Sequence, residues 1–211
     1  LTMRVATIMF PVCLALCCGA CFVTIDIYEI RLKTILLLSN IGLFLTTLYY
    51  LEATLKYLAL PNPLGQLDGS YKLALCYNIM ITILYWLIRV WDSSYLYDGT
   101  YRKPEWYVLF LHGGLLLLLV LEHLLWRRHT PYAGYEYLFM LISGLVLTAC
   151  IYAPWFLLDY AVYPFVKSFG AAEFALLPIL IVLLLFLGVR AHLYFVSLTK
   201  GTEESQKLID V

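Results

Sequence analysis

The most regular feature of the chain is a series of long apolar stretches separated by short polar connections. Each stretch is long enough to cross a hydrocarbon core about 30 Å thick as an α-helix. Helices are expected rather than barrel strands, because the runs are long and uniform and a helix satisfies its own backbone polar groups. The pattern predicts an all-α polytopic bundle of six transmembrane helices, near residues 5–25, 34–60, 71–91, 106–126, 136–158 and 171–196.

The connections and the polar end of the chain complete this organisation. The linkers are short and rich in turn-forming residues, such as PNPLGQLDGS at 61–70, and none has room for a soluble domain. We therefore predict one transmembrane domain over 1–199 and a polar C-terminal tail over 200–211. An even number of spans places both termini on one side of the membrane.

Composition agrees with this reading and excludes other classes of protein. Hydrophobic residues make up 63% of the chain and charged residues only 13%, whereas a soluble domain has about 25% charged residues. We therefore expect a multi-pass integral membrane protein whose immediate partners are membrane lipids. The 14 basic residues are balanced by 14 acidic ones, and no basic tract of the kind that binds nucleic acid is present.

The six cysteines all lie inside apolar runs. Zinc sites and disulfide frameworks usually present cysteines from loops with polar neighbours. We therefore expect neither a metal nor a cofactor.

Ionisable groups inside the spans are costly, so each is a functional candidate. Glu52 and Lys56 are four residues apart on one helical face and can pair with each other. Glu122 and His123 stand close to Trp126 and two arginines at the end of a span. We expect those two side chains to be solvated or salt-paired at the membrane boundary.

His112 differs, because it lies about two turns inside its span beside Gly113 and Gly114. The glycines would let another helix or a ligand approach closely. The imidazole either hydrogen-bonds a neighbouring helix and sets packing, or acts as a general base for a nucleophile on another helix. Residue chemistry alone does not choose that nucleophile among the hydroxyls in the spans, which include Ser39, Thr46, Thr47, Thr54, Thr82, Ser143 and Thr148.

Three short motifs give the chain a resemblance to a known family. They are FLT at 44–46, His112 placed ten residues before Glu122, and VYPF at 162–165. In order and spacing the chain resembles the androgen-induced-gene/FAR-17a family of multi-span membrane proteins, apart from a shorter connection between the second and third helices.

The resemblance implies an activity and a site. Members of this family are threonine hydrolases that cleave fatty acid esters of hydroxy fatty acids inside the bilayer. Their nucleophile corresponds to Thr46 and their base to His112. Such a reaction needs donors for the oxyanion, and Asn78, the hydroxyl of Tyr49 or Tyr50, or an exposed helical N–H could serve. Polar neighbours that often precede the histidine in the family are replaced here by Phe110 and Leu111. The resemblance also implies the endoplasmic reticulum or the plasma membrane as the location.

A non-catalytic role is the alternative. The chain also has a weaker likeness to Rolling stone-like membrane proteins, and this likeness implies no enzyme activity. It rests on YN at 77–78, LYW at 84–86 and HGG at 112–114. A small six-helix protein could also be a structural subunit of a larger membrane complex, for example in the mitochondrial inner membrane. An enzyme would bring Thr46 and His112 to one lipid-accessible cavity, whereas a scaffold would pack His112 against a neighbour.

Overall fold

The computed structural model shows a bundle of long helices. It describes residues 2–28, 37–58, 67–91, 104–126, 134–159, 163, 166–167 and 169–209. Within these residues there is no β-strand, so the all-α prediction is confirmed. The elements in chain order are α1 (Thr2–Tyr28), α3 (Leu38–Tyr57), α4 (Leu67–Trp91), α5 (Glu105–Leu109), the π-helical turn η2 (Phe110–Gly114), α6 (Leu115–Trp126), α7 (Gly134–Leu158) and α8 (Ala171–Ile209).

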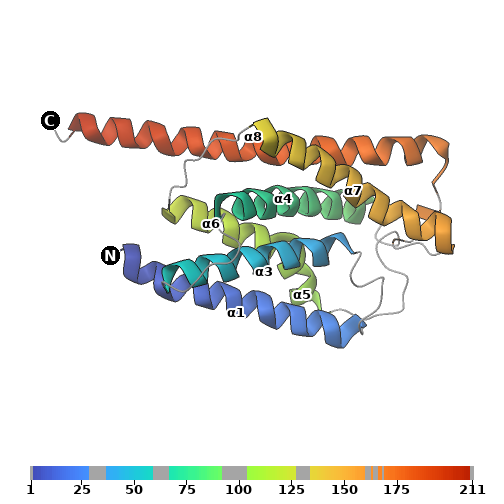
Figure 1. Ribbon diagram of the computed structural model, residues 1–211, viewed down its shortest axis with the longest axis horizontal. Helices are drawn as coiled ribbons and strands as arrows, with labels where there is room; N and C mark the ends of the chain where they lie inside the picture. The colour runs from blue at the N-terminus through green and yellow to red at the C-terminus, as the bar shows by residue number, and fades with distance from the viewer. Residues whose placement is uncertain are drawn as a thin grey trace.

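The segments α5, η2 and α6 follow one another without a break and form a single rod, so the part of the chain that the structure describes forms six rods. Successive rods run in opposite directions along the long axis, and both ends of the chain lie at the same end of the molecule (Figure 1). The central helix is α4, which packs against α3, α8 and the rod of α5 to α6, while α1 covers α3 and α7 covers α8. Helix α4 is therefore the element against which the candidate side chains are placed.

The observed helices correspond to the six predicted runs, with two differences at their ends. Helix α4 begins at Leu67, so residues 67–70 of the predicted linker are helical. Helix α8 continues to Ile209, across the boundary predicted between the transmembrane domain and the tail. The remaining linker residues, and most of VYPF, lie outside the described residues.

The distribution of polarity is the reverse of that in a soluble protein, as α3 shows. Its outward side chains include Phe44 and Leu51, which are 59% and 38% exposed, while Thr46, Glu52 and Thr54 are buried. Apolar side chains facing outward and polar ones facing inward are typical of helices whose surroundings are lipid.

Four helices of the described chain are long and apolar enough to cross a membrane, which indicates an integral membrane protein. Helix α3 is not among them, because its inward-facing polar residues lower its mean hydropathy, and α1 contributes a shorter apolar segment, Ile8–Thr24. The four segments are Gly69–Trp91, Glu105–Leu124, Tyr135–Leu157 and Ala171–Tyr194.

Two glycines allow α4 to approach its neighbours closely. A Cβ atom added to Gly188 would lie 2.9 Å from the Cα of Cys76, and one added to Gly42 would lie 2.6 Å from Cδ1 of Ile81. Small residues at such points let helix backbones come together in lipid, where packing replaces the hydrophobic effect as the driving force. The contact at Gly42 holds α3 against α4 one turn from Thr46.

Tyr163, from the VYPF tract, contacts the start of α3. The backbone N–H of Leu38 donates a hydrogen bond of 2.7 Å to the Tyr163 hydroxyl oxygen. Desolvation raises the pKa of this phenol, and the hydrogen bond from Leu38 partly offsets the shift. The described residue of the tract thus satisfies one of the N–H groups that every helix leaves open at its start.

Candidate functional site

Thr46 and Asn78 form a buried polar pair between α3 and α4. The Asn78 side-chain amide donates to Thr46 Oγ at 2.9 Å and also to the backbone oxygen of Ala74 at 2.8 Å. The Thr46 hydroxyl in turn donates to the backbone oxygen of Gly42 at 2.8 Å. Thr46 is 0% exposed and Asn78 1%. An N–H donor held against the hydroxyl oxygen stabilises the negative charge that oxygen gains when it loses its proton.

His112 lies on the π-helical turn, packed against α4. Its Nδ1 is 2.8 Å from the backbone oxygen of Val108, and its ring stacks on Tyr85 with ring centroids 3.7 Å apart and planes inclined by 19°. Because a carbonyl oxygen only accepts, Nδ1 carries the proton, and in the neutral ring the lone pair is then on Nε2. The backbone oxygen of Val108 and the ring of Tyr85 therefore orient the imidazole. The polar residues that often precede the histidine in the resembled family are not needed for this, and Phe110 and Leu111 stand in their place.

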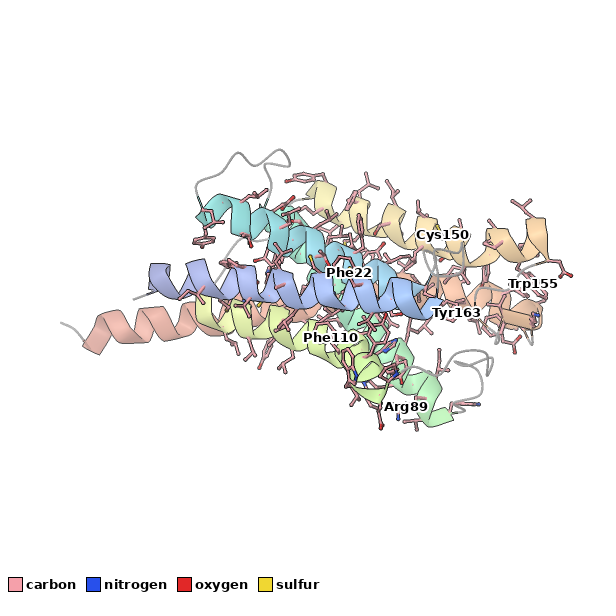
Figure 2. The ribbon with its side chains drawn as sticks, turned by 90° about the horizontal axis from the view of Figure 1, so that it is seen from below. Phe22, Arg89, Phe110, Cys150, Trp155 and Tyr163 are labelled. Atoms are coloured by element: carbon pink, nitrogen blue, oxygen red, sulfur yellow. The ribbon has the colours of Figure 1, made fainter. Side chains whose placement is uncertain are left out.

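The region around His112 extends to charged groups at the end of α4. Arg89 donates to the Tyr85 hydroxyl at 3.0 Å and lies 3.8 Å from the carboxylate of Glu105. The Arg89 guanidinium also lies over the Trp86 ring, 5.2 Å from its centroid. Figure 2 labels Phe110, two residues before His112, and Arg89 near the end of α4. Tyr85 thus joins the half-buried imidazole to a half-exposed arginine, as expected where a helix end meets the membrane surface.

The two predicted catalytic side chains contact α4 at different heights. Thr46 meets Asn78, and His112 meets Tyr85, seven residues further along the same helix. At 1.5 Å per residue this is about 10 Å along α4. Direct proton transfer needs about 3 Å or one bridging water, so this offset between the two contacts would have to close for Thr46 and His112 to exchange a proton.

Tyr49 and Asn78, the two predicted supports, have separate partners. Asn78 contacts Thr46, whereas the Tyr49 hydroxyl donates to the carboxylate of Glu122 on α6. Both residues are fully buried. Thr46 therefore contacts Asn78 of α4, whereas Tyr49 belongs to a different cluster with Glu122 and Tyr71.

That second cluster corrects the expectation for Glu122 and His123. They are 0% and 2% exposed, not solvated at a boundary. His123 stacks against Tyr71 with ring centroids 6.1 Å apart, and its ring meets that of His192 edge-on at 5.4 Å. The neighbours of His123 in the sequence predicted the wrong environment, because rings from α4 and α8 pack around its imidazole in the folded chain.

Two further polar pairs were not anticipated. Lys72 donates to both oxygens of the Glu136 carboxylate, at 2.9 and 3.0 Å, and links α4 to α7. The Ser70 hydroxyl donates to Glu52, while Lys56, the expected partner of Glu52, is exposed. The available signal was that Ser70, Lys72 and Glu136 all lie in the first turns of apolar helices, where neighbouring helix ends meet.

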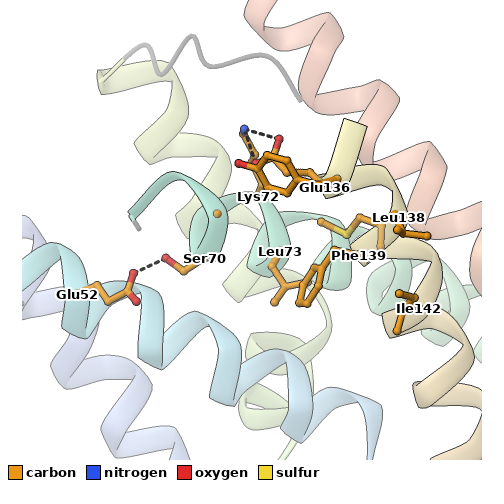
Figure 3. A pocket seen from close by; sticks show the side chains of 11 residues that line it. Glu52, Ser70, Lys72, Leu73, Glu136, Leu138, Phe139 and Ile142 are labelled. Atoms are coloured by element: carbon orange, nitrogen blue, oxygen red, sulfur yellow. Dashed lines mark hydrogen bonds and ion pairs between the residues drawn. The ribbon is translucent and has the colours of Figure 1, made fainter. Parts of the chain in front are cut away.

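Both pairs line a pocket of about 590 Å³ between α3, α4 and α7 (Figure 3). Among the described residues, no group of three or more His, Cys, Asp or Glu side chains is placed to hold a metal ion.

Comparison of the chain with protein-family models, curated proteins and solved structures finds no match. The resemblance to the androgen-induced-gene/FAR-17a family stays a prediction, and the chemistry of the site carries the functional argument.

Proposed function

We propose that the chain is a six-span membrane protein, with both termini on one side, that hydrolyses lipid esters within the bilayer. The substrate class is fatty acid esters of hydroxy fatty acids or similar lipid esters. Thr46 is the nucleophile, His112 the general base, and Asn78 the donor that stabilises charge on the nucleophile. One observation carries the proposal: a fully buried threonine hydroxyl accepts a hydrogen bond from a buried amide in a bundle that exposes apolar side chains.

The chemistry follows from these groups. Nε2 of His112 takes the Thr46 proton, and Oγ forms a bond to the ester carbonyl carbon, whose oxygen becomes negative. As the carbonyl re-forms, the alkoxide of the hydroxy acid leaves and takes the proton from His112. Water then attacks the acyl-threonine, again giving its proton to His112, and Thr46 regains a proton as the fatty acid leaves.

The π-helical turn favours this role for His112. Such turns contain one residue more than an α-helical turn and occur frequently at functional sites. A change between π and α geometry at Phe110–Gly114 would move the imidazole relative to Thr46. We infer that this change, or a short chain of water, closes the gap of about 10 Å along α4.

A structural subunit of a larger membrane complex is the second candidate. The stacking of His112 on Tyr85 at 3.7 Å favours it, because this contact alone is a sufficient packing role for the imidazole. In that case Thr46 and Asn78 would serve as an interhelical hydrogen bond between α3 and α4.

Turnover of a lipid ester by the purified chain in detergent separates the two candidates. Removing a nucleophile abolishes the covalent route, so Thr46→Ala is expected to lower kcat by about 10³-fold or more. Thr148→Ala is the matched control, because Thr148 is also buried and donates to the carbonyl oxygen four residues earlier, at 2.9 Å. Equal turnover in the two variants would reject the role of Thr46.

A further inference from the structure

The pocket between α3, α4 and α7 has a polar end and an apolar end. Glu52, Ser70, Lys72 and Glu136 supply the polar groups, and each lies within about two turns of the end of its helix. The apolar wall includes Leu73, next to Lys72 on α4, and Phe139 and Ile142, which lie about one and two turns past Glu136 on α7 (Figure 3). A lipid with its headgroup at the membrane surface and its chain inside the bilayer has the same gradient of polarity.

The charges at the polar end are not balanced. The charged side chains that line the pocket are two carboxylates, Glu52 and Glu136, and one ammonium, Lys72. Lys72 donates to both oxygens of Glu136. Glu52 is 5% exposed, and its described contact is the hydrogen bond from Ser70. Among the described residues, no lysine or arginine lies within ion-pair distance of the Glu52 carboxylate. A buried carboxylate without a cation is costly, so the site favours a positive group.

The volume of the pocket further limits the class of ligand. The pocket volume of about 590 Å³ falls in the range of about 300–1,000 Å³ that is usual for sites of small molecules. This suits one headgroup and one chain rather than a whole two-chain phospholipid. A free fatty acid would bring a third carboxylate to the polar end, and Lys72 is already paired.

From these observations we propose that the pocket binds a single-chain lipid amine, with its ammonium group on Glu52 and its chain along Leu73, Phe139 and Ile142. The Ser70 hydroxyl accepts from the ammonium while it donates to Glu52. This site is separate from Thr46 and His112, and the proposal does not depend on hydrolysis. The pocket would give the chain a separate lipid-binding function, at the opposite end of α4 from His112.

Thermal unfolding of the full chain in a neutral detergent tests the proposal. Octadecylamine, octadecanol and octadecanoic acid, which differ only in headgroup, are added at equal mole fractions. A ligand that binds the folded state raises Tm, so the amine is expected to raise it more than the alcohol or the acid. An equal effect of the alcohol, or a larger effect of the acid, would overturn the proposal.

Two variants assign any effect to this pocket. Glu52→Gln keeps the shape and the acceptor for Ser70 but removes the charge, so the apparent affinity for the amine should fall about tenfold or more, as expected for loss of a hydrogen bond to a charged group. Glu173→Gln, at an exposed carboxylate on α8, is the matched control. Ile142→Trp fills the apolar end at a side chain that is 49% exposed, and it should weaken binding of the amine even if Glu52→Gln does not fold. Unchanged affinity for the amine in Glu52→Gln or in Ile142→Trp would place the amine elsewhere and reject the site.

Discussion

His112 and His123 lie on the same rod, eleven residues or about 16 Å apart, yet they belong to different kinds of environment. His112 is half-buried on a π-helical turn, with its ring on Tyr85 and one nitrogen bonded to the backbone. His123 is fully buried on a regular helix, between the rings of Tyr71 and His192. Both lie in one leucine-rich run of the sequence, and the helices packed around each imidazole decide what it can do.

The two environments suit different roles, a general base for His112 and a packing residue for His123. A backbone carbonyl holds one nitrogen of His112 as a donor, which places the lone pair of the neutral ring on the other nitrogen, as a general base requires. His123 is enclosed by aromatic rings in a cluster that includes the hydrogen bond from Tyr49 to Glu122. We expect His112 to matter for turnover and the cluster around His123 to matter for the stability of the bundle.

The largest expected effect is on catalysis by His112. His112→Ala should lower kcat for a lipid ester by about 10²–10⁴-fold, the usual contribution of a general base. His123→Ala should leave the kcat of the folded protein close to that of the parent and lower its unfolding temperature, because it opens a cavity among Tyr71 and His192. Turnover per folded molecule, with folding measured in the same sample, checks the pair. Equal losses of kcat in both variants would remove the distinction.

The next effect concerns stability at the His123 end. Tyr49→Phe removes the hydroxyl that donates to the buried Glu122 carboxylate, and leaving such a group without that donor costs about 1–3 kcal/mol. Denaturant unfolding in mixed micelles measures the free energy. Tyr135→Phe is the control, at a tyrosine that is 71% exposed. If the two substitutions cost the same, the Tyr49–Glu122 contact contributes nothing to the fold.

The smallest effect tests how His112 is positioned. A stacked aromatic pair contributes about 0.5–1.5 kcal/mol, so Tyr85→Ala should lower kcat by a few-fold to about tenfold. Tyr85→Phe keeps the ring and loses only the hydroxyl that accepts from Arg89, so it should restore most of the lost kcat. If the kcat of Tyr85→Phe is no higher than that of Tyr85→Ala, stacking on the ring does not position the base.

The helices could be predicted from the sequence more completely than the site. Apolar runs are sufficient to locate α4 and the rod that ends at Trp126, because helix formation in lipid depends on local polarity. Glu122 and His123 were placed wrongly, because their environment is made by Tyr49, Tyr71 and His192 from three other helices. The pair of Thr46 with Asn78 depends on the close approach at Gly42, which no local pattern specifies.

The most direct test of the hydrolase proposal is to locate the residue that a fluorophosphonate probe modifies in the membrane-embedded chain. Peptide mapping by mass spectrometry should find the adduct on Thr46. Labelling should be lost in Thr46→Ala, slowed in His112→Ala and unchanged in Thr148→Ala. An adduct on another residue, or labelling of Thr46 at the same rate without His112, would contradict the proposed roles.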